Sequence, residues 1–217
     1  MTSESLLSEL SCPVIPVVVI EDIEHAVPLA EALFSGGIAA LEITLRTDLG
    51  LKAVSKLKAE FPDRPVGAGT VCTPAQFAAA ADAGADFIVS PGATQALLST
   101  ASNHALPFLP GAVTASEVMR VMELGFSVLK FFPAETSGGA AALRALAGPF
   151  PSLRFMPTGG ITRDNLGDYI RLDNVLAVGG SWLTPRALCQ AERWDQIEQL
   201  ASETAELSRA LQSEVSK

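Results

Sequence analysis

Short apolar segments alternate along the chain with longer segments in which apolar residues recur at helical spacing. The short segments are rich in β-branched and other apolar residues, as expected for strands of a parallel sheet that is buried on both faces. The predicted strands are Val14–Ile20, Ala39–Thr44, Pro65–Ala68, Phe87–Ser90, Pro107–Leu109, Phe126–Phe131, Leu153–Met156 and Val175–Val178.

A predicted helix follows each strand, and local signals mark several of the helix ends. Thr73 and Pro74 suit the N-cap and first position of a helix, while Thr114 and Glu117 have capping-box spacing. Glycines end other helices at Gly36-Gly37, Gly84 and Gly125. The predicted helices are Ile23–Ser35, Leu49–Glu60, Pro74–Ala83, Thr94–Asn103, Thr114–Leu124, Gly139–Ala147, Thr162–Ile170 and the sequence beyond the eighth strand.

Eight βα units in succession predict an α/β protein with a parallel sheet and right-handed crossovers. A closed barrel and an open doubly wound sheet share this pattern. The count of eight favours the barrel, and no G-x-G-x-x-G follows the first strand to support the open sheet. We therefore expect residues 1–217 to form a single (β/α)8 TIM-barrel domain. A short amphipathic helix at about residues 3–11, with Leu6, Leu7 and Leu10 on one face, should precede it.

Charge and composition narrow the classes of partner. The formal net charge is −9, which disfavours nucleic acid, so an anionic substrate needs a local positive site. The three cysteines form neither a disulfide framework nor a zinc motif, and the two histidines are too few for a metal cluster. Without an apolar run of about 20 residues or a signal peptide, the sequence predicts a cytoplasmic protein with no membrane partner.

Lys130 is the sharpest chemical signal in the sequence. Barrel enzymes carry their chemistry at the carboxyl ends of the strands, and Lys130 lies there among Val128, Leu129, Phe131 and Phe132. Apolar surroundings favour the neutral amine, which is the form that attacks a carbonyl group. The simpler alternative is a lysine that extends from the strand end into solvent. Taken alone, the two interpretations are about equally supported.

Glu42 is a carboxylate in a strand that otherwise lacks charge. An unpaired buried carboxylate is costly, so this side chain requires either a partner or a role in general acid–base chemistry. A structural ion pair with Arg46 or Lys130 is the plainer alternative. In a barrel, Glu42 and Lys130 fall near the same rim, and this convergence favours a catalytic role.

Glycine pairs mark the ends of the last two strands, at Gly159-Gly160 and Gly179-Gly180. In barrels the corresponding loops often bind phosphate through backbone N–H groups. A single Gly-Gly more often means a tight turn, so the signal rests on the two pairs together and on Ser181, which follows the second.

Other polar or rim residues give weaker signals. Thr70 ends the third strand and has a hydroxyl suited to a substrate carboxylate, although a simple turn residue explains it equally well. Pro91 and Phe132, judged by themselves, shape and pack the rim.

Six segments together form a recognisable set. They are Leu41–Thr47 (LEITLRT), Gly67–Val71 (GAGTV), Ser90–Gly92 (SPG), Val128–Glu135 (VLKFFPAE), Phe155–Ile161 (FMPTGGI) and Val178–Leu183 (VGGSWL). In this order and spacing, from about Pro13 to Pro185, they resemble the 2-keto-3-deoxy-6-phosphogluconate (KDPG) aldolases. These bifunctional class I enzymes also cleave 4-hydroxy-2-oxoglutarate (KHG).

The resemblance implies roles for particular residues. Lys130 matches the lysine that forms the Schiff base, and Glu42 matches the glutamate that moves protons. Thr158, in the PTGG segment, resembles the gluconate-type rather than the galactonate-type relatives. The implied substrate-binding residues are Arg46, Thr70, Pro91, Phe132 and Thr158, and the implied phosphate-binding residues are Gly159, Gly160, Gly180 and Ser181.

The implied reaction cleaves a phosphorylated keto acid to pyruvate and glyceraldehyde 3-phosphate, without a metal or an organic cofactor. The resemblance also implies a homotrimer. Three alternatives stay open from the sequence: a galactonate-type aldolase, a phosphosugar isomerase or epimerase on a similar barrel, and a catalytically silent binding protein. Trapping a lysine adduct with borohydride separates the aldolases from the isomerase.

Overall fold

Parallel strands, each followed by helical structure, form the frame of the molecule in the computed structural model, which describes residues 2–215. The strands are β1 (Val14–Val18), β2 (Leu41–Thr44), β3 (Val66–Gly69), β4 (Ile88–Val89), β5 (Phe108–Leu109), β6 (Val128–Phe131), β7 (Arg154–Pro157) and β8 (Val178–Gly180). They agree with the predicted strands in order, and most bounds differ by one or two residues.

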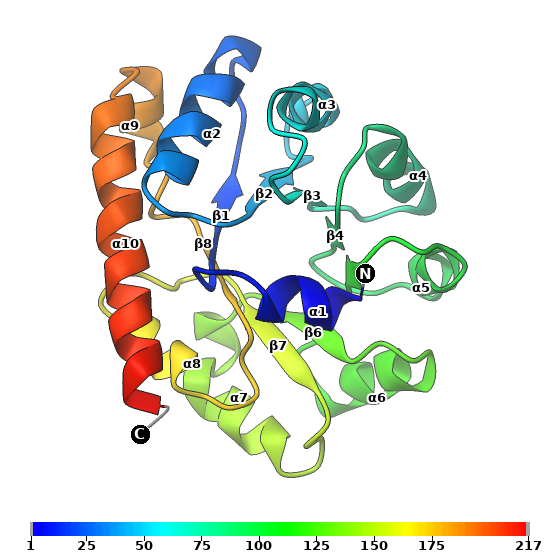
Figure 1. Cartoon of the computed structure of the whole chain (residues 1–217). Coiled ribbons are helices and arrows are strands. Elements are labelled where there is room, and N and C mark those ends of the chain that lie inside the picture. The colour runs from blue at the N-terminus through cyan, green and yellow to red at the C-terminus, as the bar shows by residue number, and fades with distance from the viewer. Residues whose placement is uncertain (1, 216–217) are drawn as a thin grey trace.

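Helices cover the outside of the strands (Figure 1). They are α1 (Ser3–Ser8), α2 (Ala26–Ser35), α3 (Gly50–Glu60), α4 (Pro74–Asp82), α5 (Gln95–Ser102), α6 (Ala115–Glu123), α7 (Gly139–Ala147), α8 (Leu166–Ile170), α9 (Arg186–Gln190) and α10 (Trp194–Val215), with 3-10 turns η1 (Ile23–His25) and η2 (Glu135–Ser137). The Thr73 N-cap and the Thr114–Glu117 capping box are confirmed. The glycines Gly37, Gly84 and Gly125 adopt the expected positive φ.

The strands curl around a common axis (Figure 1). Six of them form one parallel sheet in the order β5-β4-β3-β2-β1-β8, and β6 pairs in parallel with β7. Isolated parallel bridges join Gly111 to Lys130 and Thr158 to Gly179, next to the ends of β5, β6, β7 and β8. The predicted α/β class and parallel sheet are confirmed, while closure into a complete eight-stranded barrel stays a prediction.

The side chains that point inward from the strands pack in layers. Successive strand residues face opposite sides, so Val128 lies on the same inner face as Lys130, one layer closer to the amino ends of the strands. Helix α1 covers this layer, and Leu6, Leu7 and Leu10, which were predicted to share one face of the helix, pack against it. Further members of this inner cluster are Ile15, Ala40, Phe87, Val89, Leu109, Met156 and Ala177. Apolar side chains therefore fill the inside of the curled strands at their amino ends, and the polar inner residues lie toward the carboxyl ends.

The long helix α10 packs along α2 (Figure 1). Gly36 permits this close approach, because a Cβ atom at that position would lie 2.4 Å from the Cβ atom of Ala201. The helical sequence after β8 is interrupted between α9 and α10, where Glu192 has a positive φ of 52°.

Three predicted elements have wrong bounds. Helix α1 ends at Ser8 instead of about residue 11: Glu9 is its C-cap, and the Leu10 N–H donates to Leu7 O at 3.4 Å in a closing turn. Helix α8 begins at Leu166 instead of Thr162: the Thr162 N–H donates to the Asn165 side chain in a preceding turn.

The third element with wrong bounds is the last strand. Strand β8 spans Val178–Gly180 instead of Val175–Val178. The chain is still turning at Val175, whose N–H donates to Leu172 O at 2.9 Å. The glycines then pair with β1, with Ile15 opposite Gly179 and Pro16 opposite Gly180.

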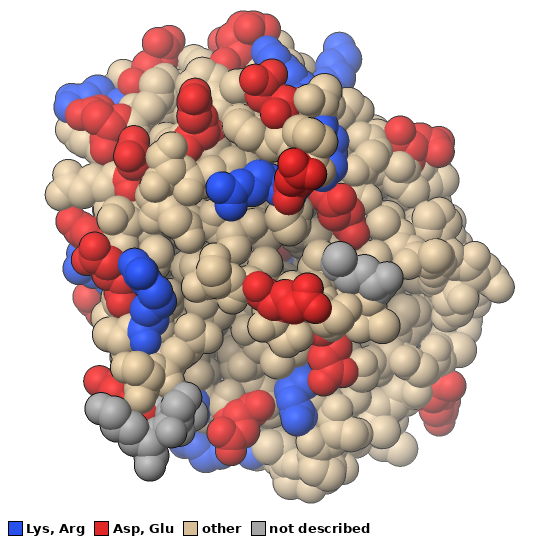
Figure 2. Space-filling model, in the orientation of Figure 1, with Lys and Arg blue, Asp and Glu red and all other residues tan. Residues whose placement is uncertain are grey.

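Charged side chains of both signs are interspersed on the face that α1 covers (Figure 2). This agrees with a chain in which acidic residues outnumber basic ones, 24 to 15. Within residues 2–215, no helix combines the length and the hydropathy that crossing a membrane requires.

Candidate active site

Lys130 and Glu42 meet on the inner side of the curled strands. The Lys130 Nζ atom lies 3.0 Å from Glu42 Oε1 and 3.4 Å from Oε2, and the two residues are 4% and 0% exposed. Of the two ion-pair partners that the sequence suggested for Glu42, the structure selects Lys130. A buried pair of this kind costs desolvation energy and adds little to stability by itself. Its presence at the strand ends therefore suits a chemical role, with an amine and a proton acceptor in direct contact.

Strand β3 makes room for this pair by placing glycine at both of its inward positions. A Cβ atom on Gly69 would lie 2.1 Å from Glu42 Oε1, and one on Gly67 would lie 2.3 Å from the ring of Phe87. Glycine inside a strand often marks such a close approach. The G-A-G segment thus sets the position of the Glu42 carboxylate, a role that sequence analysis did not assign to it.

Thr158 directly follows β7, and its side chain points inward. Its Oγ1 atom has no hydrogen-bond partner, and no other buried side-chain polar atom in residues 2–215 lacks one. An unsatisfied buried hydroxyl costs about 1–3 kcal/mol. Gly179 leaves space for it, because a Cβ atom there would lie 2.2 Å from Thr158 Oγ1. Such a hydroxyl is suited to a polar group of a ligand.

The Gly159-Gly160 turn adopts a backbone that glycine tolerates best, with φ values of 101° and 77°. The ring of Phe132 lies between this turn and Lys130. It would be 3.2 Å from a Cβ atom on Gly159, and its centroid is 5.5 Å from Lys130 Nζ. The Phe132–Pro133 peptide bond is cis. Phe132 therefore connects the predicted phosphate turn with the lysine.

Thr70 and Pro91 lie at the ends of their strands, as predicted. Thr70 has a φ of 60°, and Thr70 and Glu192 are the only non-glycine residues with positive φ in the described part of the chain. Such a conformation costs on the order of 1–3 kcal/mol and tends to persist at functional sites. Pro91 packs over Gly111, where a Cβ atom would lie 2.3 Å from the Pro91 carbonyl carbon.

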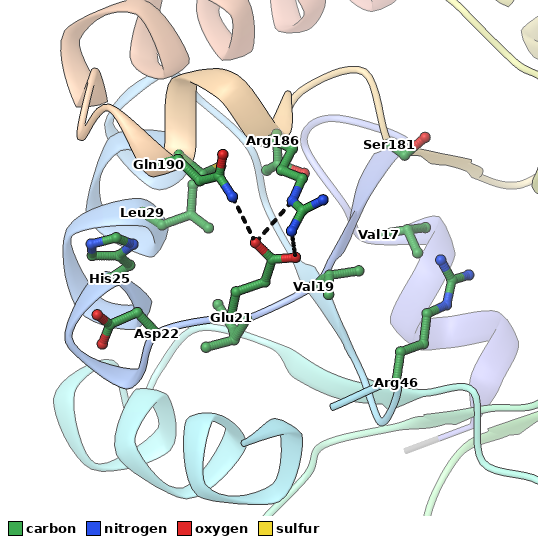
Figure 3. Close-up of a pocket in the computed structure, with 13 residues that line it drawn as sticks. Val17, Val19, Glu21, Asp22, His25, Leu29, Arg46, Ser181, Arg186 and Gln190 are labelled. Carbon is green, nitrogen blue, oxygen red and sulfur yellow. Dashed lines mark hydrogen bonds and ion pairs between the residues drawn. The ribbon is translucent and has the colours of Figure 1, made fainter. Parts of the chain in front are cut away.

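Arg46 and Ser181 border a cavity of about 380 Å³ beside the end of β1 (Figure 3). Arg46 lies at one side of the cavity and His25 at the other. Across the described residues, Arg46 has no hydrogen-bond or ion-pair partner. Its guanidinium group is therefore free to provide the local positive charge that an anionic substrate needs.

The outer wall of this cavity is closed by an ion pair that sequence analysis missed. Glu21 accepts hydrogen bonds from Arg186 at 3.0 Å and from Gln190 at 3.2 Å (Figure 3). Cys189 also lines the cavity, and burial raises the pKa of its thiol. Glu21 and Arg186 are 165 residues apart, so no local pattern reveals their contact.

The second glycine pair differs from its predicted form. Gly179 and Gly180 belong to strand β8 and not to a turn, because they pair with β1. A Cβ atom on Gly180 would lie 2.0 Å from the ring of Trp182, so the structure requires glycine there for packing. Ser181, which follows the strand and is exposed, is free to contact a ligand.

Within residues 2–215, no group of three or more His, Cys, Asp or Glu side chains is placed so that it could hold a metal ion. The site is instead built from one amine, one carboxylate, a guanidinium group, hydroxyls and a glycine turn. They come from β2, β3, β6 and β7 and the segments that follow these strands. That chemistry suits covalent attack on a carbonyl group, proton transfer and the binding of an anion.

Comparison with known proteins agrees with this set of groups. The sequence model of the KDPG and KHG aldolases matches residues 5–200. The KHG/KDPG aldolase of Escherichia coli K12 is 47% identical over 205 residues, covering 94% of this chain and 95% of that protein. The 2-dehydro-3-deoxy-phosphogluconate aldolase of Dickeya dadantii is 50% identical over 191 residues, covering 88% and 90%.

A solved structure shows the same similarity in three dimensions. The crystal structure of KDPG aldolase from Legionella pneumophila, with pyruvate captured as a covalent carbinolamine intermediate, has a TM-score of 0.91 to this chain. The two sequences are 44% identical, and the match covers 94% of this chain and 98% of that one.

Proposed function

The chain belongs to the KDPG and KHG aldolase family, and from this premise we propose that Lys130 and Glu42 catalyse its reaction. The protein is a class I aldolase that cleaves 2-dehydro-3-deoxy-6-phosphogluconate to pyruvate and glyceraldehyde 3-phosphate. It also cleaves 4-hydroxy-2-oxoglutarate to pyruvate and glyoxylate. One observation carries the assignment of residues: the buried contact of 3.0 Å between Lys130 Nζ and Glu42 Oε1.

The contact supports the first half of the reaction. Glu42 accepts a proton from Lys130, and the neutral amine attacks the C2 ketone of the substrate. The resulting carbinolamine loses its hydroxyl as water and becomes an iminium ion bonded to Lys130. Glu42 is the nearest group for returning the proton that this loss of water requires.

The iminium ion then serves as an electron sink. The C4 hydroxyl loses its proton to Glu42, directly or through a water molecule, and the C3–C4 bond breaks. Its electron pair moves to the iminium nitrogen, which leaves an enamine on Lys130 and releases the aldehyde. A proton added at C3 followed by attack of water releases pyruvate and restores the amine.

The remaining residues bind the substrate. The free guanidinium group of Arg46 and the hydroxyl of Thr70 suit the carboxylate. The unpartnered hydroxyl of Thr158 suits a substrate hydroxyl group, and Pro91 and Phe132 shape the rim. Backbone N–H groups of Gly159 and Gly160, the end of β8 at Gly180, and Ser181 receive the phosphate.

Pyruvate release from three substrates tests the function. The gluconate-type substrate should be cleaved faster than the galactonate-type substrate, because Thr158 resembles the gluconate-type relatives. KHG should also be cleaved. Release of pyruvate from none of the three would overturn the proposal, and a preference for the galactonate-type substrate would overturn its specificity.

Gly69→Ala should reduce turnover by roughly 10²-fold, because the added Cβ atom displaces the Glu42 carboxylate and small displacements of catalytic groups are costly. Gly148→Ala is the matched control, since a Cβ atom there finds only ordinary contacts, at 3.7 Å from Ala145 O. Turnover numbers of both variants check the prediction. Equal turnover in the two folded variants would contradict the role of Gly69.

Ser181→Ala should raise the Michaelis constant for the phosphorylated substrate more than that for KHG, which has no phosphate. Losing one hydrogen bond to a charged group costs on the order of 1.5–3 kcal/mol, or roughly tenfold or more in binding. This substitution is cleaner than one at Gly180, where any side chain would collide with Trp182. Equal increases for both substrates would show that the phosphate binds elsewhere.

We further propose that residues 1–217 form one domain and that its strands close into a complete (β/α)8 barrel. The parallel bridges from Gly111 to Lys130 and from Thr158 to Gly179 support closure on both sides of the β6–β7 pair. The resemblance supports a homotrimer in the cytoplasm. Light scattering that gave the mass of one chain would contradict the trimer.

A further inference from the structure

The glycine turn proposed for the phosphate rests against a carboxylate-bearing side chain. The backbone N–H of Glu135 donates to Gly159 O at 3.1 Å. The side chain of Glu135 lies behind Gly160, because a Cβ atom on Gly160 would be 2.7 Å from both the Cβ and the Cγ atoms of Glu135. A negative group therefore stands beside the place where a negative phosphate should bind, and like charges repel.

Tyr169 of α8 holds that carboxylate. Its hydroxyl donates a hydrogen bond to Glu135 Oε1, and the residue is only 1% exposed. Burial and this hydrogen bond raise the pKa of the Tyr169 phenol, so it remains a donor at any physiological pH. Gly139 leaves space for the contact, since a Cβ atom there would lie 3.3 Å from the Tyr169 hydroxyl oxygen.

A carboxylate is also a strong acceptor for backbone N–H groups. Without its hydrogen bond to Tyr169, the Glu135 carboxylate would accept hydrogen bonds from the N–H groups of the Gly159-Gly160 turn. It would then compete with the substrate phosphate for these groups. Asn165 fixes the turn from another side by donating to Gly160 O at 3.3 Å, so the turn itself has a second support.

We propose that Tyr169 is a positioning residue that keeps the Glu135 carboxylate away from the Gly159-Gly160 turn and so keeps that turn open to the substrate phosphate. The inference rests on the proposed function, which assigns the phosphate to this turn. Tyr169 touches neither the substrate nor the reacting atoms, and acts only through Glu135.

Tyr169→Phe tests the proposal by removing one hydroxyl and little else. The Michaelis constant for 2-dehydro-3-deoxy-6-phosphogluconate should rise roughly tenfold, the scale of one hydrogen bond to a charged group. The Michaelis constant for KHG, which has no phosphate, should change less than about twofold. Ser208→Ala is the matched control: it removes another buried hydroxyl, one that donates to Ala205 O at 3.0 Å on α10.

The double variant Tyr169→Phe/Glu135→Gln separates positioning from a structural role. Glutamine keeps the size of the side chain and removes its charge, so Tyr169→Phe should have no further effect on either Michaelis constant in this background. If the double variant is instead worse than Glu135→Gln alone for the phosphorylated substrate, the proposal is overturned. Equal increases for both substrates in Tyr169→Phe would also overturn it.

Glu135→Asp provides the same test should Tyr169→Phe fail to fold. It keeps the charge and the backbone N–H but shortens the side chain, so the carboxylate no longer reaches Tyr169. We expect the same selective increase in the Michaelis constant for the phosphorylated substrate, and the absence of that increase would refute the proposal. Failure of the unaltered protein to cleave either substrate would instead refute the proposed function.

Discussion

Borohydride reduction in the presence of pyruvate should attach a stable adduct to Lys130 and inactivate the protein. Pyruvate forms the same iminium ion as the substrate, and reduction converts it to an amine that water no longer hydrolyses. Peptide mass spectrometry should find the adduct on the segment that contains Lys130. An adduct on a different lysine, or none in an active preparation, would remove Lys130 from the mechanism.

Lys130→Met should abolish both the adduct and turnover, with a loss on the order of 10⁴-fold or more because the covalent route is gone. It also leaves Glu42 buried without its partner, which destabilises the fold by about 3–5 kcal/mol. The control is Lys130→Met/Glu42→Met, which replaces both charged side chains with unbranched apolar ones. We expect it to recover thermal stability without activity, which separates the chemical loss from the loss of folding.

Glu42→Gln should slow turnover by roughly 10²–10⁴-fold, the usual scale for losing a general acid–base group. Adduct formation with pyruvate and borohydride should continue in part, because the amine of Lys130 that attacks the carbonyl group is still present. The measurements are turnover of the folded variant and the yield of the trapped adduct.

Breaking the buried pair also weakens the fold, so Glu42→Gln needs its own stability control. Thermal unfolding of the variant shows whether the assay temperature lies safely below its transition. Turnover close to that of the unaltered protein would show that Glu42 takes no part in proton transfer. Complete loss of the adduct would instead mean that Glu42 is needed before the Schiff base forms.

Much of the fold follows from local sequence. The apolar segments and helical repeats predict the βα order because strand burial and helix amphipathicity each have a short period. Capping signals such as Thr114 with Glu117 act within one helical turn, and the structure confirms them. The bounds of β8 failed because tertiary pairing decides them: its glycines become strand only because β1 lies beside them.

The candidate site divides in the same way. Lys130 and Glu42 are visible in the sequence because a charge inside an apolar strand is costly and needs an explanation. Their contact joins residues 88 positions apart, and only the curl of the sheet brings them within 3.0 Å. The same holds for Glu21 with Arg186, and for Tyr169 with Glu135.

The sequence by itself determined the α/β class, the order of the strands, the family resemblance and the residues that carry unusual charge. The tertiary structure alone decided which charges meet, why Gly69 and Gly180 must lack side chains, and that Thr158 retains a hydroxyl without a partner. The physical reason is the distance along the chain over which each effect acts. Propensity, capping and burial patterns depend on residues that are close in sequence. Steric fit and hydrogen bonding between strand ends depend on distances that exist only once the strands have assembled.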